Sequence, residues 1–232
     1  MEDGKKMKIL YEDNHLIVVV KDYNIPVQED SSKDKDLFSM IKEYIKEKYN
    51  KPGNVYLGLV HRLDRPVGGV MVFAKTSKAA ARLSEQVREK VFKKEYLAIV
   101  DGKPEEIKGT LENYLLKNEK TNTSTVVKEG TKNSKYAKLD YEVLKYNEEI
   151  NLSLLKILLH TGRHHQIRVQ LSNFGHSICG DQKYGTRGRG KQISLWAYKL
   201  TIEHPITKEE MSFTALPDEV GPWVMIKDVN IM

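Results

Sequence analysis

The chain has 232 residues, of which 40% are hydrophobic and 30% are charged, a balance typical of a folded globular protein and not of a disordered chain. The longest nearly apolar run, Leu16 to Val20, is far shorter than the roughly 20 residues of a membrane-spanning helix. The N-terminus lacks the apolar core of a signal peptide. A single cysteine, Cys179, excludes an internal disulfide and a multi-cysteine zinc site, and we expect it to be a packed small residue. We therefore expect a cytoplasmic protein with no membrane partner.

Positive charge exceeds negative charge by 38 residues to 32, which gives a net charge of +6 and suggests an anionic partner. The excess gathers between residues 160 and 191. Within it, the segment Lys183 to Lys191 carries four cations, three glycines and no acidic residue. Such a loop suits either a phosphate backbone or plain exposure to solvent, and both interpretations stay open.

The first part of the chain combines strand patterns with two helix patterns, without a regular alternation of strand and helix. In chain order, the predicted elements up to residue 90 are strands at 8–11 and 16–21, a polar loop at 22–36, a helix from Leu37 that ends at Pro52-Gly53, strands at 55–60 and 69–74, and a helix capped by Thr76 or Ser77. In the second of these helices, Ala79, Leu83 and Val87 form the apolar stripe.

Strand patterns dominate beyond residue 90. The predicted strands are 94–100, 109–116, 123–128, 135–146, 151–159, 194–203 and 210–214, with one helix between Gly162 and Phe174. The apolar stripe of that helix is Ile167, Leu171 and Phe174, so Arg168 need not lie in the core. Many strands with few helices predict an α+β fold, built on a large, mainly antiparallel mixed sheet flanked by helices and loops. Without repeats or linkers, we expect a single domain over residues 1–232.

Several common chemistries are excluded by the motifs. The run Gly185 to Lys191 has the G-x-x-x-x-G-K spacing of a P-loop, but Gln192 follows where Ser or Thr is needed. No dinucleotide fingerprint, nucleophile elbow or H-E-x-x-H motif is present. His164 and His165 are adjacent, so on a helix their side chains would point about 100° apart and form a poor chelate. We expect no metal and no cofactor.

One carboxylate stands out in the segment His61 to Lys75, which reads HRLDRPVGGVMVFAK. Asp64 lies between Arg62 and Arg65, and nearby cations favour an ionised carboxylate, which suits a nucleophile better than a general acid. Gly68-Gly69 permits close approach of another backbone or of a ligand. From spacing alone, an ion-paired turn without chemistry is the alternative.

These residues resemble the RNA pseudouridine synthases of the RluA type, in which the aspartate of the H-R-L-D-R motif is catalytic. Further segments match in the family's order. They are Ala74-Lys75, Lys94 to Gly102 with the K-x-Y-x-A-x-V-x-G pattern, Leu159 to Arg168 with T-G-R-x-H-Q-I-R, Gly175 to Asp181, Tyr184-Gly185, and more weakly 195–197 and 204–205. The resemblance covers residues 8 to 217.

The resemblance implies isomerisation of a uridine within RNA to pseudouridine, in which the N1–C1′ bond breaks and the ribose rejoins the base at C5. Asp64 is then the nucleophile, acting on C1′ or on the base, or removing a proton in a glycal route, and these routes stay open. Tyr96 is expected to stack on the extruded uracil and to assist proton removal at C5. Arg168 is expected to pair with Asp64 and hold it ionised.

RNA is the implied partner, with ribosomal RNA slightly favoured over transfer RNA, and we expect a monomer. The target nucleotide must leave its stack, and Arg62 is the candidate to fill the vacated space. The further candidates for RNA contacts are His61, Arg65, Lys75, Arg163, His165 and the loop 183–191. Ordinary solvent exposure is the alternative for the weaker of these.

Two departures from the family pattern are expected to alter how RNA is held. Val67-Gly68-Gly69 stands where the family commonly has Thr-Ser-Gly, and His164 stands where Thr is common. Asp64 lies so near the N-terminus that we expect no RNA-binding module before the catalytic domain. Two other functions remain open: a non-catalytic RNA-binding protein of the same fold that acts in ribosome assembly, and an N-glycoside hydrolase that uses Asp64 with a second carboxylate.

Overall fold

The computed structural model describes residues 7–186, 188 and 190–231. The chain divides into two compact units, the first formed by Met1–Lys93 with Ala197–Leu216 and the second by Lys94–Trp196 with Pro217–Met232. Within the described ranges, eleven strands accompany three α-helices and one short 3₁₀ helix, which confirms the α+β class. None of the helices in those ranges is long and apolar enough to cross a membrane. The single domain over residues 1–232 stays a prediction.

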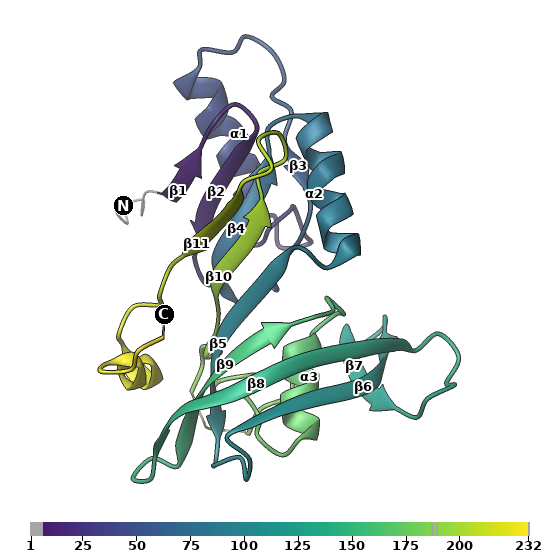
Figure 1. The fold of residues 1–232 in the computed structure, drawn as a ribbon, viewed down its shortest axis with the longest axis vertical. Helices are drawn as coiled ribbons and strands as arrows, with labels where there is room; N and C mark the ends of the chain where they lie inside the picture. The colour runs from purple at the N-terminus through teal and green to yellow at the C-terminus, as the bar shows by residue number, and fades with distance from the viewer. Residues whose placement is uncertain (1–6, 187, 189, 232) are drawn as a thin grey trace. The chain divides into compact units, whose positions relative to one another are not determined.

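The first unit is a sheet with helices packed on it (Figure 1). Its elements are β1 (Lys8–Glu12), β2 (Leu16–Lys21), α1 (Leu37–Lys48), β3 (Gly58–Leu59), β4 (Gly68–Ala74), α2 (Ser77–Glu89), β10 (Leu195–Glu203) and β11 (Glu210–Thr214). The strand order is β1-β2-β4-β10, with β3 on β4 and β11 on β10. The ladders of β1 with β2, β2 with β4, β3 with β4, and β10 with β11 are antiparallel.

Both faces of β2 and β4 are covered, because alternate side chains point to opposite faces. Val18 and Val72 share an apolar cluster with Leu83 of α2, whereas the Phe73 ring lies 6.4 Å from the ring of Phe38 in α1. The predicted cap of α2 is confirmed, since the Thr76 hydroxyl accepts a hydrogen bond from the Ala79 amide at 3.2 Å. The central strands of this unit are therefore fixed between two helices.

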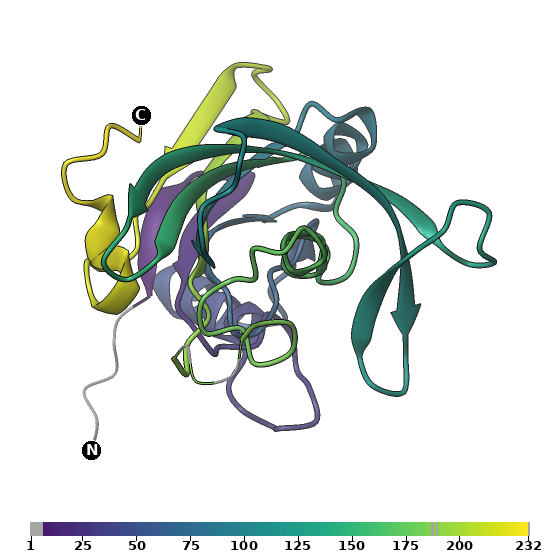
Figure 2. The same ribbon diagram turned by 90° about the horizontal axis from the view of Figure 1, so that it is seen from below.

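The second unit is a curved antiparallel sheet of order β5-β9-β8-β6-β7. Its elements are β5 (Lys93–Asp101), β6 (Lys108–Asn118), β7 (Thr123–Val127), β8 (Lys135–Asn147), β9 (Leu152–Leu159), α3 (Gln166–Asn173) and the 3₁₀ helix (Gly221–Ile226). Figure 2 shows α3 on the concave side of the strands. All of its residues from Gln166 to Leu171 are buried.

Several elements differ from their predictions. The helix from Leu37 ends at Lys48, before Pro52-Gly53. The strand predicted at 55–60 is only Gly58–Leu59, because Gly58 already pairs with Ala74, the last residue of β4. The third helix begins at Gln166 and not near Gly162, because His165 adopts a left-handed backbone conformation with φ of 53°. The 3₁₀ helix at Gly221–Ile226 was not predicted, although a proline in its first turn favours such a start.

Candidate active site

The Asp64 turn belongs to the first unit and leads from β3 into β4. The Val67 amide donates to the Asp64 carbonyl at 2.9 Å and closes the turn. His61 Nε2 accepts a hydrogen bond from the Val72 amide at 3.2 Å, which fastens the beginning of the turn to β4. The Asp64 side chain is partly exposed and Arg62 is exposed. The turn therefore presents both groups on a fixed backbone.

At Gly69 another backbone segment comes close, as the sequence indicated. Its φ is +128°, and a Cβ built there would lie 2.2 Å from the Ala197 carbonyl oxygen. The neighbour that comes close is thus the backbone of β10. Only glycine fits this position without displacing that strand.

Lys21 lies beneath the turn and was not singled out from the sequence. Its side chain is fully buried at the end of β2, and its Nζ donates to the backbone carbonyls of Arg65 at 2.9 Å and Asp22 at 3.0 Å. Burial lowers the pKa of Lys21 to about 7, against the opposing charges of Asp64 and Asp22. The detectable signal is a lysine that ends the apolar run Leu16 to Val20.

The stability provided by Lys21 should depend on pH. Because its folded pKa of about 7 lies below the ordinary value of 10.5, the unfolded state binds more protons between these two pH values, and stability rises with pH there. The free energy of unfolding of the wild type, measured by urea denaturation, should therefore increase relative to Lys21→Met from pH 7 to pH 10. Each unit of pKa difference corresponds to about 1.36 kcal/mol. A constant difference between the two proteins over this range would contradict the assignment.

Arg65 is held by the polar loop that follows β2. Its Nη1 donates to Ser32 Oγ at 2.7 Å and lies 3.3 Å from Asp30 Oδ2, while its Nη2 pairs with the Asp34 carboxylate. These groups are largely exposed, so the contacts are of the weak kind that an RNA phosphate can replace. The predicted RNA contact of Arg65 would therefore require the acidic loop to release it.

Removing the two carboxylates should strengthen RNA binding. In the double variant Asp30→Asn with Asp34→Asn, Arg65 no longer has anionic partners, so we expect higher RNA affinity. The plot of log affinity against log salt should also be steeper, by about 0.7 to 0.9 if one phosphate is gained. The matched control is Glu148→Gln with Glu149→Gln, which makes the same charge change at an exposed turn of the second unit. Equal effects in both double variants would show that only net charge matters.

Lys75 is committed to an ion pair in the first unit. Its side chain is 8% exposed, and its Nζ lies 2.7 Å from Glu12 Oε1. Burial would raise the pKa of Glu12, but hydrogen bonds from Lys48 and Lys75 and from two tyrosines outweigh it and lower that pKa to about 2. An RNA contact by Lys75 stays a prediction, and the ion pair supplies a structural role for this residue.

Tyr96 and Arg168 belong to the second unit, where both are buried. The prediction that Arg168 need not lie in the core is wrong, because its Nε and Nη2 donate to the two carboxylate oxygens of Asp181, each at 2.7 Å. Burial would raise the pKa of Asp181, but these hydrogen bonds and the guanidinium charge hold it below its ordinary value. A bidentate carboxylate thus makes burial of the guanidinium tolerable. The pairing of Arg168 with Asp64 stays a prediction.

A polar network connects this ion pair to β7. The Tyr184 hydroxyl accepts from the Ser124 amide at 2.6 Å and lies 2.8 Å from His165 Nδ1, and the Arg168 guanidinium lies 5.3 Å from the centre of the Tyr184 ring. The rings of His164 and His165 are stacked 3.7 Å apart. The prediction that they diverge is wrong, because the left-handed residue His165 precedes the helix. Since His165 is buried in this network, its predicted RNA contact stays untested.

The remaining basic candidates lie in loops. Arg163 is exposed, and its Nε donates to the Tyr136 carbonyl at 2.8 Å. In the loop 183–191, Arg187 and Arg189 lie outside the described residues, whereas Lys183 Nζ donates to the Asn122 carbonyl at 2.7 Å.

Among the described side chains, no group of three His, Cys, Asp or Glu could hold a metal ion. Cys179 is buried, as expected for a packed residue.

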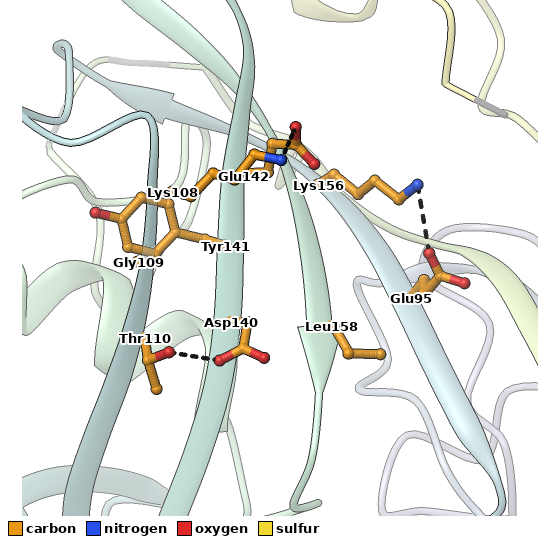
Figure 3. Close-up of a pocket in the computed structure, with 9 residues that line it drawn as sticks. All are labelled: Glu95, Lys108, Gly109, Thr110, Asp140, Tyr141, Glu142, Lys156 and Leu158. Atoms are coloured by element: carbon orange, nitrogen blue, oxygen red, sulfur yellow. Dashed lines mark hydrogen bonds and ion pairs between the residues drawn. The ribbon is translucent and has the colours of Figure 1, made fainter.

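A pocket of about 440 Å³ lies on the sheet of the second unit (Figure 3). None of the residues that line it is a predicted site residue. Its charged groups are paired across the strands. Lys108 pairs with Glu142 at 2.9 Å and Lys156 with Glu95 at 3.5 Å, and the Asp140 carboxylate accepts a hydrogen bond from the Thr110 hydroxyl at 2.7 Å. A pocket whose charges are matched internally offers little attraction to an RNA phosphate.

Comparison with known proteins identifies the family. The family described as RNA pseudouridylate synthase matches residues 15–173. An uncharacterized RNA pseudouridine synthase of Bacillus subtilis, YhcT, is 34% identical over 88% of this chain and 66% of its own length. Ribosomal large subunit pseudouridine synthase C of Haemophilus influenzae is 32% identical over 91% of this chain and 65% of its own length. This chain thus spans about two thirds of the length of these curated relatives. The solved structure of human RNA pseudouridylate synthase domain containing 1 matches with a TM-score of 0.75 at 26% identity, over 96% of this chain and 88% of that one. The chain belongs to the RNA pseudouridylate synthase family of enzymes.

Proposed function

We propose that this chain isomerises uridine in structured RNA to pseudouridine without a cofactor, with Asp64 as the nucleophile. The observation that carries the proposal is the Asp64 turn, which presents a partly exposed carboxylate on a backbone closed by the Val67 amide and held by the buried Lys21 Nζ through the Arg65 carbonyl. A carboxylate held on such a turn can approach a substrate as a nucleophile. The family match is consistent with this chemistry.

The other residues take roles that follow from their chemistry. Tyr96 stacks on the extruded uracil and assists removal of the C5 proton. Arg168 orients Asp64 through a further donor of its guanidinium, which carries five N–H groups. Arg62, an exposed cation on a fixed turn, fills the space that the flipped nucleotide leaves. Asp64 attacks C1′ or the base, or removes a proton in a glycal route.

We propose ribosomal RNA ahead of transfer RNA as the substrate, and a monomer as the active form. The name of the Haemophilus influenzae relative places that protein's activity on the large ribosomal subunit. Unstacking a nucleotide costs a few kcal/mol, which favours loops and distorted stems as targets. Specificity then depends on RNA shape around the uridine.

Tritium release tests the proposal. Transcripts of ribosomal and transfer RNA carry tritium at uracil C5, and the wild type is added without metal or nucleotide. Formation of the C1′–C5 bond expels the C5 hydrogen, so we expect tritium in the solvent and pseudouridine in the RNA. Tight, salt-sensitive RNA binding without release would instead favour the non-catalytic binder, and free uracil would favour the glycoside hydrolase.

A further inference from the structure

Lys94 lies on β5 beside the T-G-R loop of residues Thr161 to Arg163. Lys94 pairs with Leu159 in the antiparallel ladder of β5 with β9, and the loop begins two residues beyond Leu159. A Cβ built on Gly162 would lie 3.4 Å from Lys94 Nζ. The ammonium therefore lies against the one position of this loop that has no side chain.

The Lys94 ammonium has an unfavourable environment. The side chain is partly buried, and burial lowers the pKa of Lys94 with no carboxylate opposing it. Within the described parts of the chain, no side chain or carbonyl accepts a hydrogen bond from its Nζ and no acid pairs with it. A desolvated, unpaired cation destabilises a fold. The presence of Lys94 despite this cost in stability is explained if an anion binds its ammonium during function.

The loop opposite Lys94 is rigid and carries a second cation. The Gln166 side-chain oxygen accepts from the Thr161 hydroxyl at 2.7 Å and from the Arg163 amide at 3.0 Å. The Gln166 amide group donates to the Lys138 carbonyl at 3.1 Å, which fastens the loop to β8. The Arg163 guanidinium remains exposed. Two cations thus flank an open glycine on a fixed backbone.

We propose that Lys94 and the Thr161–Arg163 loop bind a phosphate of the RNA backbone next to the target uridine. The inference rests on the proposed function, because Lys94 and Tyr96 lie on the same face of β5, about 7 Å apart along the strand. A phosphate at Lys94 is then one strand repeat from a uracil stacked on Tyr96. The phosphate also supplies the charge partner that Lys94 does not find among the described residues.

The variant Lys94→Met separates this role from a structural one. Because methionine removes a desolvated charge and keeps an unbranched side chain only one atom shorter, we expect an unchanged or higher Tm. RNA binding should weaken, and the slope of log affinity against log salt should become shallower by about 0.7 to 0.9, the value for one phosphate. The kcat/KM for tritium release should fall about 10- to 100-fold, as for loss of one charged hydrogen bond. Lys94→Arg should restore the salt slope.

The matched control is Lys51→Met, which removes one exposed positive charge from the first unit and should leave the salt slope and the rate unchanged. A wild-type slope and rate in Lys94→Met would overturn the proposal, and so would a lower Tm with losses that Lys94→Arg does not restore. The proposed function and the Lys94 proposal are tested by separate measurements. If the wild type releases no tritium from any transcript, the proposed function fails, whereas the salt slope of Lys94→Met still decides whether Lys94 meets a phosphate.

Discussion

Replacing Asp64 by asparagine should abolish tritium release, with a loss of at least about three orders of magnitude in kcat, while RNA affinity changes about twofold or less. Asparagine keeps the size and the hydrogen-bonding oxygen of the side chain but cannot act as a nucleophile or base. The turn itself should persist, because its closing hydrogen bond and the Lys21 contact use the backbone carbonyls of Asp64 and Arg65. Single-turnover tritium release and filter binding on the same transcript provide the measurement.

Asp22→Asn is the matched control for this experiment. Asp22 is the other carboxylate whose charge opposes the burial of Lys21, so both variants remove one negative charge from the same buried lysine. We expect Asp22→Asn to retain activity within a few fold. If the two variants lose activity equally, Asp64 acts by supporting Lys21 and not as the nucleophile.

The fold was predictable wherever local pattern decides structure. The apolar run of β2 and the Thr76 cap of α2 are properties of short segments, and both are confirmed. β3 and α3 were predicted too long because their limits are set elsewhere. β3 begins only at Gly58, which pairs with the last residue of the antiparallel strand β4, and α3 begins only after the left-handed residue His165.

The candidate site was predictable only as far as its motifs reach. Asp64 is visible because its cationic neighbours are adjacent in sequence. Lys21 escaped notice because its partner, the Arg65 carbonyl, is 44 residues away. The Ser124 contact with Tyr184 spans 60 residues and has no local pattern. Burial of Arg168 depends likewise on a tertiary partner, Asp181, which the helical stripe does not contain.

The ion pair of Arg168 and Asp181 should be the most sensitive point of the second unit. Their side chains are 5% and 0% exposed, so Arg168→Met leaves a buried carboxylate without its guanidinium. We expect this variant to lose about 3 to 5 kcal/mol in the free energy of unfolding, measured by urea denaturation. Asp181→Asn should lose a similar amount, because it strands the cation instead. A loss below about 1 kcal/mol in both variants would show that solvent reaches the pair.

The double variant Arg168→Met with Asp181→Asn distinguishes stability from catalysis. Because neither charge remains and asparagine can still accept from the Lys183 and Tyr184 amides, most of the lost stability should return. Tritium release should not return if Arg168 orients Asp64. Recovery of both stability and activity in the double variant would assign Arg168 to the fold alone.

The stability that Asp181 provides should depend on pH. The pKa of Asp181 is lowered in the folded state, so the contribution of this carboxylate to the free energy of unfolding is complete above its ordinary pKa of 3.8 and is lost as pH falls through the folded value. The stability advantage of the wild type over Asp181→Asn should therefore shrink only in acid below about pH 4.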